Sequence, residues 1–327
     1  MGLTTFRSPR PSTASVEVAT LEEDLAGITA PELTPLSSST VPAGYTIGYF
    51  VEPKRRYEID GVEVPSVTTV LGCLDKPALP WWGMKMGVAG VLALIEAGAL
   101  GWSSVSNTLA YTDGPETVIG TDENIVKLLT ANKLTVNHQR DKAAVRGVGA
   151  HNAFEAWAIT GKLPDPDNHP VEEKGYVTGL LSFCTDIGDA WETSGVEVMV
   201  GSKEHGFAGR YDLRGKVNRD VRLVTKACTK DGKPLVKGPK YTTVPAGTTL
   251  LVDLKSSKSI YSSHLMQLEG YEGAGIECGY DATDARAVLH ITADGLYQFK
   301  RARATYDDFL AVLHTYYALE SVKKALA

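Results

Sequence analysis

The sequence has few cysteines, no long apolar run and no overall excess of basic residues. Its cysteines lie far apart and include no C-x-x-C pair, so we expect free structural thiols at Cys73, Cys184, Cys228 and Cys278. No apolar run approaches the roughly 18–20 residues of a membrane span, which argues against a membrane protein. The start of the chain lacks the apolar core of a signal peptide, and we therefore expect a cytoplasmic location.

Net charge is −6, whereas proteins that coat nucleic acid usually carry a basic excess. One segment differs from this average. Between Arg214 and Lys240 lie nine basic and two acidic residues, a local charge of +7. Such a segment is either a solvated hairpin or a surface that follows phosphates by releasing counterions. The second interpretation predicts DNA-binding lysines at Lys226, Lys230, Lys233, Lys237 and Lys240.

Composition along the chain predicts a short arm followed by one domain. Residues 1–40 are rich in Ser, Thr, Pro and Glu, which is typical of a flexible N-terminal arm. We assign 41–327 to a single domain, with a mainly helical part over 66–193 and a sheet core over 194–327.

Hydrophobic periodicity predicts the main elements of this domain. Hairpin turns are expected at Asp60-Gly61 and Asp231-Gly232. Helices are expected after Pro80 and over 122–135, 138–160 and about 171–193. Strands are then expected from about residue 195, with a helix, a strand pair and a closing helix after them. This order predicts an α/β or α+β domain with a central mixed β-sheet flanked by helices.

An apolar strand, "LLVDLK", ends in an acid and a base, Asp253 and Lys255. Residues i and i+2 of a strand project from the same face, so the two side chains lie together. A lone D-x-K is most often a surface ion pair. Here, however, Asp212 in "GFAGRYD" lies on a strand that can pair with this one. Two carboxylates on neighbouring strands stay ionised only with a cation between them, which predicts a Mg²⁺ or Mn²⁺ site.

This combination is suited to phosphodiester hydrolysis. A divalent ion lowers the pKa of bound water and neutralises charge on a phosphate under attack. Lys255 beside it can orient or deprotonate the water and neutralise phosphate charge.

Two predicted helices carry further polar pairs. In "RGVGAHNAFEAW", His151 and Glu155 are one turn apart, and Arg146 lies just before them. Gln267 and Tyr271 are at i, i+4 on the helix that follows the D-x-K strand. Either pair alone would be interpreted as ordinary helix packing.

The order R-G-x-x-x-H, G-x-x-D, D-x-K and Q-x-x-x-Y resembles the P-D…(D/E)-x-K nuclease superfamily. It is similar in particular to the RecB-like exonucleases, which include CRISPR-adaptation nucleases and many phage recombination exonucleases. The resemblance spans about residues 45–320, and "PSVTTVLGCLDKPALPWWGMKM" is similar to the opening of such nucleases from phages of actinobacteria. It implies a single nuclease domain with a restriction-endonuclease-like core and the Lys-rich segment as an inserted β-ribbon.

The resemblance also implies roles for individual residues. Its metal ligands would be the histidine, both aspartates and one backbone carbonyl, namely His151, Asp212, Asp253 and Leu254. Lys255 would be the catalytic lysine, acting with Asp253 and Asp212, while Gln267 and Tyr271 assist at the phosphate or the water. Glu197 in "GVEVMV" matches a less constant acid of the family.

The chain departs from the family pattern in two ways. Many RecB-like relatives hold an iron–sulfur cluster with one early and three clustered late cysteines, and the cysteines here do not have that spacing. We therefore expect no iron–sulfur cluster. The 41 residues from Asp212 to Asp253 exceed what a hairpin needs, and the Lys-rich segment occupies this interval.

We therefore predict a Mg²⁺- or Mn²⁺-dependent DNA exonuclease that acts on single- or double-stranded ends in phage recombination, replication or end processing. Arg146 and the Lys-rich ribbon would hold backbone phosphates, and a recombination or annealing protein is a candidate partner. One alternative is a structure-specific or nicking endonuclease of the same fold. Others are a non-catalytic DNA-binding module on a degenerate nuclease fold, and an α/β protein whose charged pairs are structural. Digestion polarity, strand preference and oligomeric state are not determined by the sequence.

Overall fold

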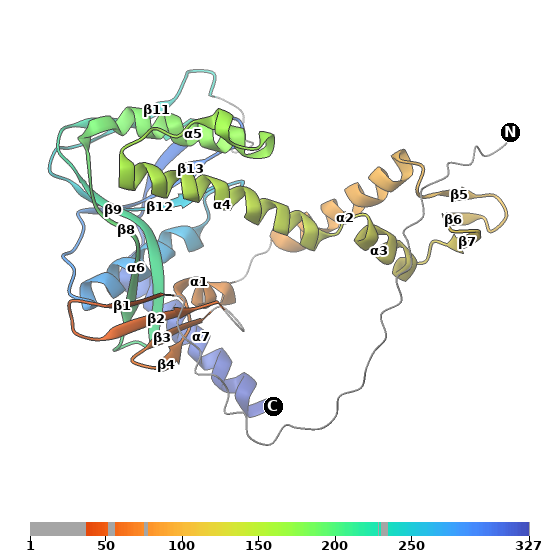
Figure 1. Cartoon of the computed structure of the whole chain (residues 1–327). Helices are drawn as coiled ribbons and strands as arrows, with labels where there is room; N and C mark the ends of the chain where they lie inside the picture. Colours follow the sequence, from red (N-terminus) through yellow and green to blue (C-terminus); the bar gives the residue numbers. More distant parts are fainter. Residues whose placement is uncertain (1–36, 52–55, 75–77, 228, 230–234, 327) are drawn as a thin grey trace, which may run out of the picture. The chain divides into compact units, whose positions relative to one another are not determined.

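The computed structural model describes residues 37–51, 56–74, 78–227, 229 and 235–326 (Figure 1). The predicted arm lies outside this part of the chain, except for its last four residues. These form strand β1 (Ser37–Thr40), which pairs with β2 (Thr46–Phe50), so they belong to a sheet rather than to an arm. The described residues belong to one compact unit, Pro35–Ala327.

A five-stranded sheet forms the centre of this unit, in the order β14-β13-β12-β9-β8. The bounds of its strands are β8 (Trp191–Ser202), β9 (Phe207–Val217), β12 (Thr249–Lys255), β13 (Ala285–Ile291) and β14 (Tyr297–Arg301). Helix α6 (Ser262–Glu277) connects β12 to β13, which run parallel, and the other neighbours are antiparallel. The prediction of a mixed α/β domain is therefore confirmed.

Helices cover both faces of this sheet, and each face has its own hydrophobic core. On one face, α4 (Val136–Thr160) and α5 (Val171–Ile187) contribute Phe154 and Phe183 to a cluster that we call the α4–α5 core. On the other, α6 and α7 (Tyr306–Leu326) contribute Leu268 and Phe309 to the α6–α7 core. The continuous run 250–254 of β12 is buried because a strand covered on both sides needs apolar residues at successive positions.

A second sheet, β1-β2-β3-β4, adds to the α6–α7 core through Ile47 and Ile59. Strands β3 (Arg56–Ile59) and β4 (Val62–Val64) form the predicted hairpin. Its turn residues Asp60 and Gly61 both have positive φ, 47° and 81°, as two-residue hairpin turns require. Short helices follow at α1 (Val67–Val70) and η1 (Leu71–Cys73).

The segment before α4 has a small core of its own, built from Leu94, Leu100 and Leu129. It contains α2 (Ala78–Glu96), α3 (Asp122–Ala131) and a three-stranded sheet of β5 (Gly101–Ser103), β6 (Thr108–Asp113) and β7 (Glu116–Ile119). The sequence analysis does not predict this sheet.

Helix α5 ends earlier than predicted, at Ile187 rather than near 193. Gly188 follows with φ 52°, a positive value that ends the helix. Strand β8 then begins after the short turn η3 (Gly188–Ala190). Another short turn, η2 (Pro166–Asn168), precedes α5. The predicted start of the strands near 195 is therefore four residues late.

The predicted ribbon between β9 and β12 is present as β10 (Val221–Lys226) and β11 (Lys240–Val244), an antiparallel pair. The predicted turn at Asp231-Gly232 lies outside the described residues. Two hydrogen bonds hold the ribbon against β14. The amide of Val224 donates to the Tyr297 hydroxyl at 3.1 Å, and the amide of Ala227 donates to Gln298 Oε1 at 3.3 Å.

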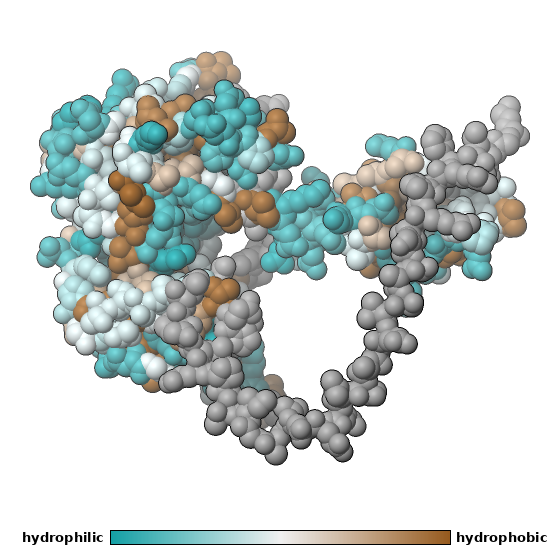
Figure 2. All heavy atoms as spheres, in the orientation of Figure 1, coloured by the Kyte–Doolittle hydropathy of each residue, from teal (hydrophilic) through white to brown (hydrophobic). Residues whose placement is uncertain are grey.

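Within the described ranges, no helix is long and apolar enough to cross a membrane. Hydrophilic residues cover most of the face drawn in Figure 2, with separate smaller areas of apolar ones. Cys184 and Cys278 are buried and Cys73 is partly exposed, and all three are free thiols, while Cys228 lies outside the described residues.

Candidate active site at the end of the central sheet

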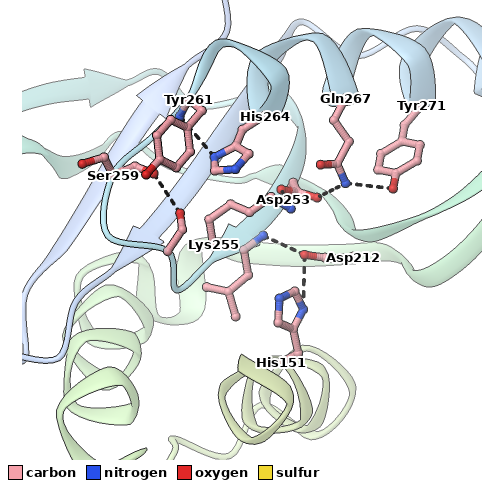
Figure 3. Close-up of polar contacts among 11 residues, drawn as sticks. His151, Asp212, Asp253, Lys255, Ser259, Tyr261, His264, Gln267 and Tyr271 are labelled. Carbon is pink, nitrogen blue, oxygen red and sulfur yellow. Dashed lines mark hydrogen bonds and ion pairs between the residues drawn. The ribbon is translucent and has the colours of Figure 1, made fainter. Parts of the chain in front are cut away.

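The acid and the base of "DLK" lie together at the end of β12, under helix α6 (Figure 3). Asp253 is buried, 1% exposed, and its Oδ2 lies 2.5 Å from Lys255 Nζ. The other oxygen, Oδ1, accepts a hydrogen bond from Gln267 Nε2 at 3.1 Å. The same Nε2 donates to the Tyr271 hydroxyl at 2.8 Å. Of the two α6 residues predicted to assist, Gln267 therefore bonds the predicted acid directly, and Tyr271 is connected to it through Gln267.

Burial and neighbouring charges act in opposite directions on this pair. Burial raises the pKa of Asp253, while Lys255 opposes this and Asp212 adds to it. For Lys255, burial lowers the pKa, but the carboxylates of Asp253 and Asp212 outweigh burial and raise it overall. This shift favours the ammonium form of Lys255, which can neutralise phosphate charge and orient a water.

Asp212 joins the two neighbouring strands and helix α4 at this point. Its Oδ2 accepts a hydrogen bond from the backbone N–H of Leu254 at 2.7 Å and lies 3.5 Å from His151 Nδ1. His151 points toward it from α4 (Figure 3). A Cβ at Gly147 would lie 3.2 Å from the Ser256 hydroxyl, so the glycine of R-G-x-x-x-H lets α4 approach the chain just after Lys255.

The glycine of G-x-x-D has a similar packing role. A Cβ at Gly209 would lie 2.5 Å from Cε1 of Tyr271, closer than real Cβ contacts allow. The two motifs therefore fit each other: the absent side chain at Gly209 makes the space that the Tyr271 ring occupies.

Strands β8 and β9 both change the face that they present beside the site. Val196 packs on the α4–α5 core and Val198 on the α6–α7 core, although residues i and i+2 of a regular strand share a face. Their partners in β9 show the same change of face, because Leu213 packs in the α4–α5 core and Tyr211 in the α6–α7 core. Glu197 and Asp212 lie between these residues, opposite each other in the register.

Glu197 itself has a strained backbone, with φ 51°. The other non-glycine residues with positive φ in the described part of the chain lie in turns, at Asp60, Asn107 and Lys133. A left-handed residue inside a strand costs of order 1–3 kcal/mol and persists only where the surrounding structure holds it. Here the distortion turns the Glu197 side chain toward Asp212.

Three potential metal ligands meet as a result. One ligand atom from each of His151, Glu197 and Asp212 lies within 4.8 Å of the others. Burial and the nearby Asp212 carboxylate raise the pKa of Glu197 to about 7, although Arg210 Nε lies 2.7 Å from Glu197 Oε2. Two carboxylates and an imidazole are donors suited to a divalent cation, which would relieve the repulsion between the acids.

Asp253 lies beside these three residues, but the group of close ligand atoms found in the described part of the chain does not include it. The buried Oδ2 of Asp253 is paired with the Lys255 ammonium at 2.5 Å, while burial and the charge of the nearby Asp212 raise the pKa of this carboxyl. A divalent cation would relieve the repulsion between these two carboxylates as well. The residues present therefore fit a divalent metal. The proposed ligation by Asp253 and by the Leu254 carbonyl stays a prediction.

A cleft of about 340 Å³ opens onto the site. To its lining, two sheets and helices α4 and α6 contribute Tyr49, Tyr57, His151, Glu155, Glu197, Arg210, Asp212 and Tyr271. Sequence reasoning did not find Tyr49, Tyr57 or Arg210. Arg210 occupies a variable position of G-x-x-D, and the tyrosines come from a sheet distant in sequence, so no local pattern indicates them.

The predicted DNA-binding residues lie elsewhere or outside the described part. Lys226, Lys237 and Lys240 are exposed on or next to the ribbon, and none of them lines the cleft. Lys230, Lys233 and the side chain of Arg146 lie outside the described residues.

Comparison with known proteins adds no family to this geometry. The sequence matches no protein-family model, and no curated protein matches it significantly.

Proposed function

We propose that the protein is a Mg²⁺- or Mn²⁺-dependent DNA exonuclease with a restriction-endonuclease-like core. The observation that carries this proposal is the meeting of His151, Glu197 and Asp212 beside a buried Asp253–Lys255 pair at the end of one strand. A structural ion pair does not require three further titratable groups at the same place. Metal-assisted phosphodiester hydrolysis requires such a set.

The residues that would hold the ion are His151, Glu197, Asp212 and Asp253, with the backbone carbonyl of Leu254. When bound, a divalent ion supplies a water of lowered pKa and positive charge for the phosphate. The backbone N–H of Leu254 keeps Asp212 Oδ2 turned toward this position.

The remaining polar groups have separate tasks. The Lys255 ammonium neutralises charge that develops on the scissile phosphate and orients the attacking water. Gln267 fixes one oxygen of Asp253, and the Tyr271 hydroxyl fixes the amide of Gln267. Arg146 and the ribbon lysines hold backbone phosphates in this proposal. The setting is DNA recombination, replication or end processing in the cytoplasm, or in the host cytoplasm if a phage encodes the protein.

Cleavage assays on the Asp253–Lys255 pair test the proposal. Asp253→Ala and Lys255→Ala are each expected to abolish digestion of end-labelled DNA in Mg²⁺ and in Mn²⁺. The exposed pair Asp167–Lys174, 2.9 Å apart, is the matched control, and its alanine variants should digest DNA normally. Undiminished cleavage by both site variants would overturn the assignment.

The substrate topology separates the alternatives. An exonuclease degrades linear single- or double-stranded DNA and leaves covalently closed circles intact. Cleavage of the circles would instead identify an endonuclease of the same fold. A wild-type protein that binds DNA without cutting it in either metal would identify a binding module.

A further inference from the structure

Another pocket, of about 390 Å³, lies between the ribbon and the end of the central sheet. Three lysines line it, each from a different segment: Lys226 from β10, Lys258 from the loop after β12, and Lys300 from β14. Ser259 and Thr292 add hydroxyl groups to the lining. None of these residues belongs to the candidate active site.

The pocket contains positive charge without a counter-charge. No acidic residue is among the described residues that line it. Of the ion pairs within the described chain, none includes Lys226, Lys258 or Lys300. Lysines on an open surface are usually solvated individually. Three that line one concave site bring positive charge to it from three segments, and this charge attracts an anion.

The walls of the pocket are held in place by hydrogen bonds. Gln298 Oε1 accepts the bond from Ala227, which follows Lys226, and so fixes the ribbon next to β14. Behind the loop, the buried His290 bonds through Nε2 to the carbonyl of Ser257 at 2.6 Å, directly before Lys258. The three segments therefore present their lysines from a common, preorganised frame.

The pocket also lies close to the candidate active site along the chain. Lys258 follows Lys255 by three residues, and three residues span at most about 11 Å even when extended. Successive phosphates of one DNA strand advance by about 3.4 Å along the helix axis. A strand whose scissile phosphate lies at Lys255 therefore has another phosphate within a few nucleotides that can reach the pocket.

We propose that Lys226, Lys258 and Lys300 together form a binding site for one backbone phosphate of the DNA strand, a few nucleotides from the cleavage position. This inference rests on the proposed function for its ligand. It gives the ribbon a defined role: the ribbon closes one side of a phosphate pocket, rather than acting as a diffuse basic surface.

The test is the salt dependence of DNA binding without metal. Binding of a 20-nucleotide single strand is measured in EDTA over a range of salt concentrations, for wild type and for the combined Lys226→Gln, Lys258→Gln and Lys300→Gln variant. Loss of one phosphate contact should reduce the slope of log K against log salt by about 0.7 and weaken binding equally for different sequences. Because the three lysines hold the same phosphate, two of them remain after a single substitution, and each single variant should show only part of this change.

A matched control removes the same charge elsewhere. It replaces three exposed lysines that line neither pocket and lie outside the basic segment, Lys85, Lys127 and Lys162, with Gln. Its slope should equal that of the wild type. A pocket variant that binds like this control would overturn the inference. So would a slope change near three times 0.7 with additive single variants, because it would mean three separate phosphate contacts.

Inorganic phosphate distinguishes a free anion from DNA. If phosphate raises the Tm of wild type but not of the pocket variant, while DNA binding by the two is equal, the site holds a free anion and the assignment to DNA fails. Failure of the proposed function looks different. In that case the wild-type protein does not cut DNA in Mg²⁺ or Mn²⁺, but the pocket variant still binds DNA with one phosphate contact fewer than wild type. This result would support the phosphate pocket and contradict the nuclease proposal.

Discussion

Two acid–base pairs with a buried carboxylate lie where α6 covers the central sheet, and they differ in the partners of that carboxylate. Glu269 of α6 meets Arg286 of β13 through two bonds, at 3.1 and 2.9 Å, so one arginine engages both carboxylate oxygens. Asp253 divides its oxygens between two residues: Oδ2 is paired with Lys255 at 2.5 Å, and Oδ1 accepts a hydrogen bond from Gln267.

The contrast separates a structural pair from the pair that we propose to be catalytic. Burial raises the pKa of both Glu269 and Asp253, so the direction of titration does not distinguish them. The surroundings do. The arginine guanidinium bonds both oxygens of Glu269. Asp253 instead lies near the group of Asp212, Glu197 and His151, where the carboxylates repel one another. An added divalent cation would relieve the repulsion among these carboxylates.

The largest expected difference between the pairs is in catalysis. Lys255→Met keeps the side-chain length and removes the charge, and we expect kcat for DNA digestion to fall by roughly 10²–10³-fold, the usual effect of losing one group that stabilises transition-state charge. The corresponding change in the structural pair, Arg286→Met, should leave kcat within a few-fold of wild type at a temperature where the variant is folded. Equal losses of kcat would remove the distinction between the pairs.

The structural pair should dominate stability. Glu269→Leu leaves Arg286 without its partner, and breaking a buried pair costs about 3 kcal/mol of the free energy of unfolding. The double variant Glu269→Leu, Arg286→Met should recover most of this loss, because no buried charge is left uncompensated. Urea unfolding of the two single variants and the double variant measures the coupling. A coupling near zero would show that the two bonds do not stabilise the fold.

Packing around the proposed catalytic pair can be tested at Gly209. The variant Gly209→Ala places a methyl group against the Tyr271 ring, and we expect a loss of about 1–3 kcal/mol from overpacking. Tyr271→Leu in the same chain should relieve part of this loss, which a double-mutant cycle in urea would show. Additive losses would mean that the ring and the glycine do not share the space.

The smallest expected effect is on the pH dependence of stability in metal-free protein. Glu197 has a pKa of about 7 when folded, against an ordinary value of 4.5. Its proton is bound more tightly in the folded state, so its contribution to stability is full below pH 4.5 and is lost as the pH rises toward 7. Glu197→Gln should therefore gain roughly 1–2 kcal/mol relative to wild type across this window, less than full burial would give because the carboxyl is partly solvated.

Urea unfolding in EDTA between pH 4.5 and 7.5 checks this sign. Glu58→Gln, which changes an acid outside the cleft, is the control and should not change the slope. A Glu197→Gln variant that loses stability relative to wild type as the pH rises would contradict the strained, proton-binding environment described for this carboxyl.

Sequence patterns predicted those site residues that follow local rules. Asp253 and Lys255 share a face because a regular strand repeats every two residues, and Gln267 and Tyr271 share one because a helix returns after four. The same rules placed α4, the ribbon and the hairpin at Asp60-Gly61. They failed at the end of α5, where the single backbone angle of Gly188 ends the helix, and for the short strands between Gly101 and Ile119.

The amino-acid sequence by itself determined the strand that carries Asp253 and Lys255, the helices on either side of the sheet and the concentration of lysines in one segment, because each depends on neighbours a few residues away. Only the tertiary structure decided that Glu197 meets His151 and Asp212. That meeting depends on a left-handed residue inside β8 and on the exchange of faces that β8 and β9 make together. The pocket of Lys226, Lys258 and Lys300 likewise depends on the docking of the ribbon against β14. Contacts of this kind are set by strand register and packing across the whole domain, and no local pattern encodes them.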